Sequence, residues 1–266
     1  DDTIITNADA NEIQGGEGAD LLSGNVGNDI INGFKKGQSE SSIEYDTVSY
    51  SYLTSKSVNI DLTAGTGTVD ANDTDTLISI ENAIGGAGND TIAGSSEINS
   101  LEGGAGNDTF TSSLANDFIY GGSVSSNTHT DSHTIGDMVD FSNTINASNK
   151  LTIDLSTTVN DANSNAYSNA IVTTTGGTSV YTDRLYGIEN ISGTANNDIL
   201  TGNNSANTLL GNDGNDTLQG LAGADKLDGG AGDDLFLVAD ADVTNSGDEI
   251  IGGDDFDTVN YNGITS

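Results

Sequence analysis

The chain of 266 residues contains no cysteine and no proline, and it has only six lysines and arginines. Without cysteine, neither disulfides nor thiolate metal sites hold it together. Disordered segments are usually rich in proline, so its absence favours a regular structure. Six bases against 41 acidic residues exclude a nucleic-acid binder, which needs a basic face. No apolar run approaches the ~20 residues of a membrane helix, so we expect no direct membrane insertion.

Aspartate and glycine are abundant instead. The acids divide into 32 aspartates and nine glutamates, the formal net charge is −35, and there are 35 glycines. An ordinary solvated surface uses both acids. An excess of aspartate together with glycine indicates acids placed in turns, where a short carboxylate reaches a hard cation.

A pattern of nine residues recurs along the chain: Gly, often Gly, any residue, Gly, any residue, Asp, any residue, an apolar residue, any residue. It is clearest in the segments that begin at Gly85, Gly103, Gly211, Gly220 and Gly229. In 17 copies the eighth position is always apolar, which chance does not explain. The sixth position holds Asp2, Asn11, Asp20, Asp29, Asp46, Asp90, Asn99, Asp108, Asp117, Asp137, Asp198, Asn207, Asp216, Asp225, Asp234, Asp248 and Asp257.

A longer organisation lies above this repeat. The copies form three blocks over residues 1–34, 85–121 and 193–237, separated by connectors over 35–84 and 122–192. Residues 238–266 begin a third connector. The connectors share the alternating segments VNIDL (58–62) and LTIDL (151–155), which predict strands, and a later Ile-Glu-Asn motif. Both ends cut through a repeat, so we expect a portion of a longer tandem array.

Each part of the nonapeptide has a physical reason. Glycines at positions one, two and four permit left-handed backbone in a tight turn and let carbonyl oxygens point at a common centre. With the carboxylate at position six, the ligands are all oxygens, which favours Ca²⁺ before Mg²⁺. Positions seven to nine predict a very short strand with one inward side chain, stable only when stacked on identical strands.

We therefore expect an all-β fold, a parallel β-roll or β-helix solenoid with calcium bound in the turns and with wider turns or insertions as connectors. Rows of aspartates at the ~4.8 Å spacing of strands repel one another, and the apolar core is thin. We expect an expanded chain without calcium, in which calcium-binding energy becomes folding energy.

The repeat resembles the RTX, or haemolysin-type, calcium-binding nonapeptide. The resemblance covers roughly half of the chain. It implies a β-roll with two nonapeptides per turn, calcium between successive turns, and folding outside the cell after export through a type I secretion channel. In that family the sixth-position carboxylates and the glycine carbonyls bind calcium.

Carried over to this sequence, the family pattern gives a set of metal ligands. The carboxylate ligands are Asp20, Asp29, Asp90, Asp108, Asp117, Asp198, Asp216, Asp225 and Asp234, followed by Asp2, Asp46, Asp137, Asp248 and Asp257, which fewer glycines surround. The carbonyl ligands are Gly15, Gly18, Gly27, Gly85, Gly88, Gly103, Gly106, Gly211, Gly214, Gly223, Gly229 and Gly232. Asparagine at position six keeps an oxygen but loses the charge, which weakens a site there.

Other residues carry alternatives. His129 and His133 have the spacing of a helical zinc pair, but their Ser/Thr/Asn-rich surroundings favour a solvated loop. Glu81 and Glu189 recur in the Ile-Glu-Asn motif, and a repeated structural position favours structure or calcium ligation over catalysis. The connector tyrosines either pack on the flank of the roll or form a surface for glycans or neighbouring subunits.

We interpret the chain as a structural, non-enzymatic segment of a secreted or cell-surface bacterial protein, such as an adhesin, a surface-layer protein or an extracellular filament. Its expected partners are calcium ions and, through self-association, copies of itself or the cell surface. The alternative is a calcium-triggered folding and secretion module of an exported enzyme or toxin. A carbohydrate- or ice-binding face is a weaker hypothesis, because position three shows no regular threonine array.

Overall fold

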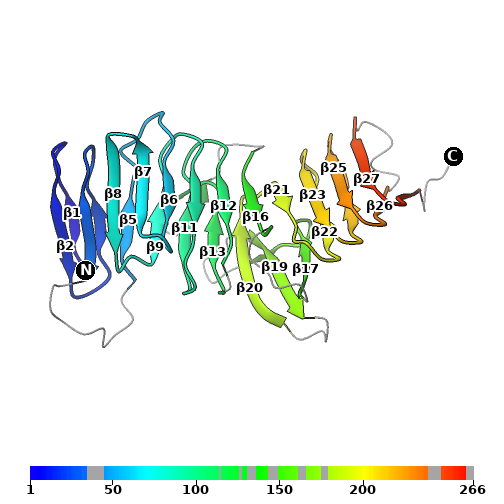
Figure 1. The fold of residues 1–266 in the computed structure, drawn as a ribbon, viewed down its shortest axis with the longest axis horizontal. Coiled ribbons are helices and arrows are strands. Elements are labelled where there is room, and N and C mark those ends of the chain that lie inside the picture. The colour runs from blue at the N-terminus through cyan, green and yellow to red at the C-terminus, as the bar shows by residue number, and fades with distance from the viewer. Residues whose placement is uncertain are drawn as a thin grey trace.

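A computed structural model describes residues 1–34, 45–113, 115–125, 128–130, 136–142, 149–160, 166–174, 179–238 and 247–261. These residues form 28 strands and no helix, so none of them forms a helix that could span a membrane. The strands stack side by side into an elongated body, with the N-terminal strands at one end and the last described strands at the other (Figure 1). The expected all-β fold with parallel strands is confirmed.

Two long sheets make up the stack. The larger has 14 strands, in the order β1 (Thr3–Ile5), β3 (Leu21–Ser23), β5 (Thr47–Ser49), β9 (Asn82–Ile84), β11 (Ser100–Glu102), β13 (Phe118–Tyr120), β20 (Ser179–Tyr186), β19 (Ala166–Thr174), β17 (Asn149–Asp154), β22 (Ile199–Thr201), β24 (Thr217–Gln219), β26 (Leu235–Leu237) and β28 (Thr258–Asn260), with β18 (Val159–Asn160) paired to β19. The smaller has 12, in the order β2 (Glu12–Gly16), β4 (Ile30–Phe34), β8 (Asp73–Ile78), β7 (Thr66–Asp70), β6 (Asn59–Asp61), β10 (Thr91–Ala93), β12 (Thr109–Thr111), β16 (Met138–Asp140), β21 (Asn190–Ser192), β23 (Thr208–Asp213), β25 (Lys226–Ala231) and β27 (Glu249–Asp254).

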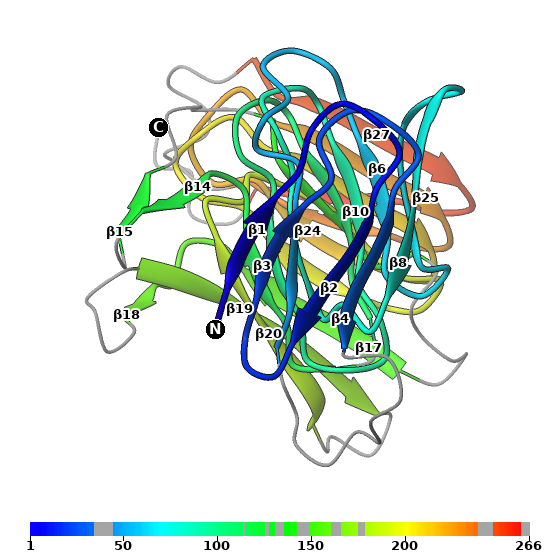
Figure 2. The same ribbon diagram turned by 90° about the vertical axis from the view of Figure 1, so that its left-hand side faces the viewer.

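Successive nonapeptides of a block contribute strands alternately to the two sheets, which a view along the stack shows as flattened coils (Figure 2). Within a block one coil therefore takes 18 residues: Ile4 pairs with Leu22 in β1 and β3, and Ile13 pairs with Ile31 in β2 and β4. Because the register places position eight on position eight, the inward side chains form one continuous row in each sheet. Leu22 and Ile31 are fully buried in this core, whereas Ile4, in the first strand, is only partly covered.

The turn glycines have two different roles. At position four, Gly18, Gly27, Gly106, Gly214, Gly223 and Gly232 have positive φ, the left-handed region that favours glycine. At position two, Gly16, Gly104, Gly230 and Gly253 do as well, whereas Gly86 at position two and Gly88 at position four keep an ordinary φ. The prediction was wrong for position one, where the glycines keep an ordinary φ. There the missing Cβ leaves room for a close approach of other atoms.

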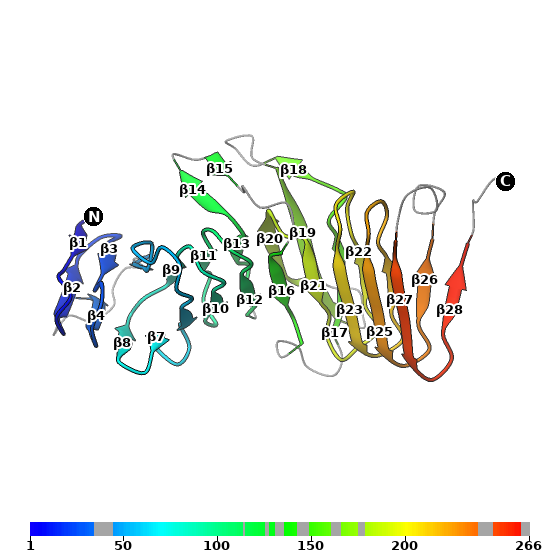
Figure 3. The same ribbon diagram turned by 90° about the horizontal axis from the view of Figure 1, so that it is seen from above.

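The connectors add strands to the same two sheets. In the first connector, β6, the antiparallel β7 and β8 lie together in the smaller sheet, between β4 and β10. In the second, β17, the antiparallel β19 and β20 lie together in the larger sheet, between β13 and β22. The solenoid thus continues through this region. The hairpin of β14 (Ser123–Ser125) and β15 (Thr128–Thr130) forms a separate small sheet that projects from the row (Figure 3).

Candidate metal centre

The sixth-position aspartates are buried where each turn enters a strand. Their side chains lie directly before the short strands, so the turn glycines and the strand register together fix their places. The buried set is Asp20, Asp29, Asp46, Asp75, Asp90, Asp108, Asp117, Asp137, Asp183, Asp198, Asp216, Asp225 and Asp234, each at most 2% exposed. Asp2 and Asp257 lie in the outermost coils and are exposed.

These aspartates form a hydrogen-bonded ladder along each side of the roll. One carboxylate oxygen, Oδ1, accepts a hydrogen bond from the backbone N–H of the sixth residue one coil earlier. Asp90 N donates to Asp108 Oδ1 at 2.7 Å, and Asp198 N donates to Asp216 Oδ1 at 2.7 Å. Each carboxylate therefore links two coils through the protein alone.

The second carboxylate oxygen, Oδ2, faces a different environment. In Asp20, Asp29, Asp216 and Asp234 it is buried and receives no hydrogen bond from the described residues. A Cβ at Gly15 would collide with Asp20 Oδ2 and lie 2.7 Å from the carbonyl oxygen of Gly33 in the next coil. The absent side chain at position one thus lets a carboxylate oxygen and a carbonyl oxygen approach one region. Two electronegative oxygens with no proton between them make a place for a cation.

The charge of the rows has little compensation from the protein. The whole chain has six lysines and arginines, fewer than half the number of buried sixth-position aspartates. Two of these bases pair outside the rows, Lys56 with Asp70 at 2.7 Å and Lys226 with Asp228 at 4.0 Å. Burial without a counter-ion raises the pKa of a carboxylate, because the neutral, protonated form is then favoured over the charged one.

The pKa values follow this expectation. Burial raises the pKa of Asp216 to about 7, and the neighbouring carboxylates of Asp198 and Asp234 add to the rise. Burial likewise raises the pKa of Asp198 to about 6 and that of Asp183 to about 7. Ionisation of these three carboxylates is therefore unfavourable at neutral pH, and a cation beside Asp216 would remove that cost there.

The ligand chemistry fits a hard cation. Among the described residues no three His, Asp or Glu side chains form a metal-binding group. A cation in a turn would instead take one carboxylate, from residues such as Asp20 or Asp216, together with backbone carbonyls. Carboxylate and carbonyl oxygens are the ligands of Ca²⁺, which tolerates flexible, irregular geometry. A zinc site would need the nitrogen or sulfur ligands that these turns lack.

Some positions in the rows are closed by protein hydrogen bonds. Asn99 Oδ1 accepts from Ser95 N at 2.6 Å, and its Nδ2 donates to the carbonyl of Glu81 one coil earlier at 2.7 Å. Asn207 repeats this arrangement, because its Nδ2 donates to the carbonyl of Glu189 at 2.8 Å. At these positions the asparagine NH₂ group donates a hydrogen bond to the backbone carbonyl oxygen, which an ionised carboxylate cannot do.

The connectors extend the rows with residues that the nonapeptide pattern did not find. Asp75, within β8, and Asp183, within β20, take the sixth position, and they accept hydrogen bonds from Asp29 N at 2.8 Å and Asp117 N at 2.9 Å. Their second oxygens are occupied by hydroxyl groups: Tyr50 donates to Asp75 at 2.8 Å, and Ser112 donates to Asp183 at 2.7 Å. The signal in the sequence was an aspartate two residues before an apolar one.

The two motif glutamates hold the same place in the next coil. Asp46 N donates to Glu81 Oε2 at 2.8 Å, and Asp137 N donates to Glu189 Oε2 at 3.3 Å. Each glutamate therefore links two coils, as the sixth-position aspartates do. Of the histidine pair, His129 lies in β15, and His133 lies outside the described residues.

A family model for the RTX calcium-binding nonapeptide repeat matches the chain in four copies, over residues 1–33, 84–119, 185–218 and 210–237. These segments are RTX calcium-binding repeats. No curated protein matches the chain. The matched segments contain the turns in which Asp20, Asp108 and Asp216 lie. The RTX repeats assign calcium as the cation of these turns, and the carboxylate and carbonyl oxygens described above are its ligand candidates.

Proposed function

We propose that this RTX segment is a calcium-dependent structural element of a secreted or cell-surface bacterial protein, which folds when it meets calcium outside the cell. The observation that carries the proposal is that, within the rows of buried aspartates, the Oδ2 atoms of residues such as Asp20 and Asp216 receive no hydrogen bond from the described residues. An elongated stack of identical coils suits an adhesin, a surface layer or an extracellular filament, in which length and stiffness matter more than a catalytic site.

The core supports the dependence on calcium. Each short strand of a block buries one position-eight side chain, such as Leu200 in β22 or Leu218 in β24. Burying a leucine contributes about 1.5–3 kcal/mol, while ordering each residue costs about 1–2 kcal/mol of backbone entropy. A nine-residue unit therefore cannot hold itself together by its core. Binding energy from a cation that occupies only the folded turns would supply the difference.

The test is a calcium titration of EDTA-stripped protein, followed by far-UV circular dichroism and light scattering together. We expect strand signal with calcium and not with equimolar magnesium, because Mg²⁺ demands a stricter geometry than these turns offer. A chain that is fully folded in EDTA at neutral pH would show that the aspartate rows do not need a cation.

A second function, a calcium-triggered folding and secretion module of an exported enzyme or toxin, uses the same turns. Light scattering distinguishes the two. Assembly on addition of calcium supports a surface-layer or filament segment, whereas a calcium-loaded monomer supports the module. We also propose that the segment itself has no catalytic activity, and an activity found for the isolated segment would contradict this.

A further inference from the structure

The second connector builds a cluster of aromatic residues and an arginine on the outer face of the larger sheet. β13 pairs with β20 in parallel, so that Phe118 lies beside Arg184 and Tyr120 lies beside Tyr186. Tyr120 and Tyr186 stack with ring centroids 4.5 Å apart. Tyr167, from β19, packs on Tyr186 with centroids 5.2 Å apart. This cluster belongs to neither the calcium turns nor the core.

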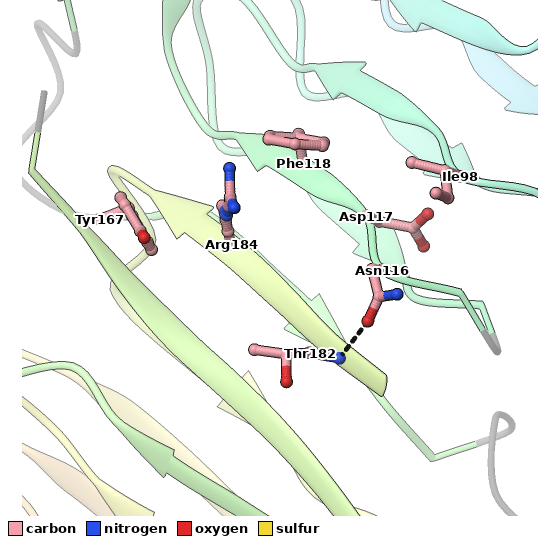
Figure 4. A pocket seen from close by; sticks show the side chains of 7 residues that line it. All are labelled: Ile98, Asn116, Asp117, Phe118, Tyr167, Thr182 and Arg184. Atoms are coloured by element: carbon pink, nitrogen blue, oxygen red, sulfur yellow. Dashed lines mark hydrogen bonds between the residues drawn. The ribbon is translucent and has the colours of Figure 1, made fainter. Parts of the chain in front are cut away.

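Arg184 is the single arginine of the chain. Its guanidinium carbon lies 4.8 Å from the ring centroid of Phe118 and 5.4 Å from that of Tyr167, and the side chain lies between the two rings (Figure 4). Arg184 is exposed and forms no ion pair with any described residue, although the protein is strongly acidic. The rings hold the planar group in place, which lowers the entropy lost when it binds a partner.

A cavity of about 380 Å³ lies beside this arginine. It is lined by Ile98, Asn116, Asp117, Phe118, Tyr167, Thr182 and Arg184 (Figure 4). The volume is at the lower end of the range for small-molecule sites, which combine apolar walls with a few placed polar groups. It suits one ring-sized unit rather than a folded partner.

The polar groups of the cavity indicate what that unit carries. Asn116 Oδ1 accepts from Thr182 N at 2.7 Å, and its Nδ2 makes no hydrogen bond with the described residues. Asp117 points away from Arg184 (Figure 4), and both of its oxygens accept hydrogen bonds, from Asn99 N at 2.9 Å and from Ser113 Oγ at 2.8 Å. The cavity therefore offers an exposed planar cation, an amide donor, hydroxyl groups and aromatic surface.

We propose that this cavity binds an acidic sugar, a hexuronate unit of a polysaccharide. Its carboxylate would pair with the Arg184 guanidinium, the fork geometry that arginine provides for carboxylates. The apolar C–H groups of its ring would lie against Tyr167 and Phe118, and its hydroxyls would bond to Asn116 and Thr182. A single negative charge fits better than a phosphate, because the −35 net charge of the chain repels a dianion more strongly.

The single arginine makes a direct test possible. In ¹⁵N-labelled, calcium-loaded protein the Arg184 Nε–Hε group gives the one arginine side-chain signal of its kind, assigned without mutagenesis. Methyl glucuronide, methyl glucoside and sodium acetate are titrated separately, at equal ionic strength and at a free calcium concentration held constant. We expect a saturable shift with the glucuronide, at a Kd at least tenfold lower than that of the glucoside or acetate.

Two variants check the assignment by calorimetry. Arg184→Lys keeps the charge but removes the planar fork, and we expect at least a tenfold weaker affinity for the glucuronide. Lys226→Gln removes a cation from the first residue of β25, the seventh position of its nonapeptide, in the other sheet, and should leave the affinity unchanged. The proposal is overturned if no saturable shift occurs, if the glucoside binds as tightly, if acetate alone reproduces the shift, or if the lysine variant binds like the wild type. The wild-type titration decides the matter even if a variant fails to fold.

Discussion

Replacing Asp216 by asparagine should change the stability of the protein in opposite directions with and without calcium. Burial and neighbouring carboxylates raise the pKa of Asp216 from an ordinary 3.8 to about 7. At about 1.4 kcal/mol per pKa unit this is about 4 kcal/mol, and solvent screening reduces the cost of the ionised group to about 2 kcal/mol. Asp216→Asn removes this cost in EDTA at pH 8. Its Nδ2 would replace the cation next to the Gly229 carbonyl, much as Asn207 Nδ2 meets the carbonyl of Glu189.

With calcium the sign reverses. A site filled at 1,000 times its Kd stabilises the folded state by about 4 kcal/mol. Because the variant loses the carboxylate ligand, it loses this stabilisation by calcium. It keeps the stabilisation of about 2 kcal/mol that it gained when the buried charge was removed. The net loss relative to the wild type is about 2 kcal/mol. Urea unfolding followed by circular dichroism measures both states, with a fixed sucrose concentration to keep the calcium-free fold populated.

Asp183→Asn is the matched control. Asp183 holds the same position, is fully buried and has a pKa raised to about 7, but both of its oxygens already accept hydrogen bonds. We expect its substitution to change stability by the same amount with and without calcium. If Asp216→Asn instead destabilises the protein equally in EDTA and in calcium, the Asp216 carboxylate is a structural hydrogen-bond acceptor, and the cation reasoning fails.

Three further predictions follow from the turns and the core. In EDTA, strand signal should be strong near pH 4 and fall as the pH rises to 7. The reason is that burial raises the pKa of Asp183 in the folded state to about 7, from the ordinary value of 3.8. This shift stabilises the fold fully below pH 3.8, and the stabilisation is lost as the pH rises through 7 and the folded carboxyl ionises. A flat pH profile by circular dichroism would contradict this. Gly211→Ala places a Cβ against Asp216 Oδ2 and should raise the calcium concentration needed for folding, with at least one calcium fewer bound in equilibrium dialysis. Tyr50→Phe leaves the buried Asp75 Oδ2 without its hydroxyl donor and should cost about 1–3 kcal/mol in urea unfolding with calcium, and an unchanged midpoint would refute it.

The nonapeptide pattern predicted most of the regular coils, because the features it contains act locally. An apolar residue at position eight, such as Leu22 or Leu200, identifies an inward-facing strand residue without knowledge of its neighbours. Identical spacing then imposes the register, since like positions stack on like. The candidate ligand residues of the regular turns are identified by the same spacing, and their role in calcium binding stays a prediction.

The connector positions could not be found in this way. Asp75 and Asp183 follow hairpin strands rather than glycine turns, so the pattern that identifies a turn is missing before them. Val58, directly before β6, and Leu151, within β17, take the sixth position. Their N–H groups still donate to Asp90 and Asp198 at 2.8 Å. The ladder of hydrogen bonds therefore continues through the backbone N–H group even where the residue at the sixth position is apolar. A sequence pattern, which records side chains, does not detect such a backbone donor.

The two insertions occupy different sheets, and this decides where specific recognition arises. β5 and its counterpart β16 begin equivalent connectors, but β5 lies in the larger sheet and β16 in the smaller one. Because each nonapeptide carries the chain from one sheet to the other, an odd number of steps separates the connectors, and their three-strand insertions fall on opposite faces. The second insertion places Arg184 beside Phe118, 66 residues away in sequence. Calcium binding thus belongs to the repeated glycine turns. A ligand surface arises where an insertion brings together residues that the repeat itself keeps apart.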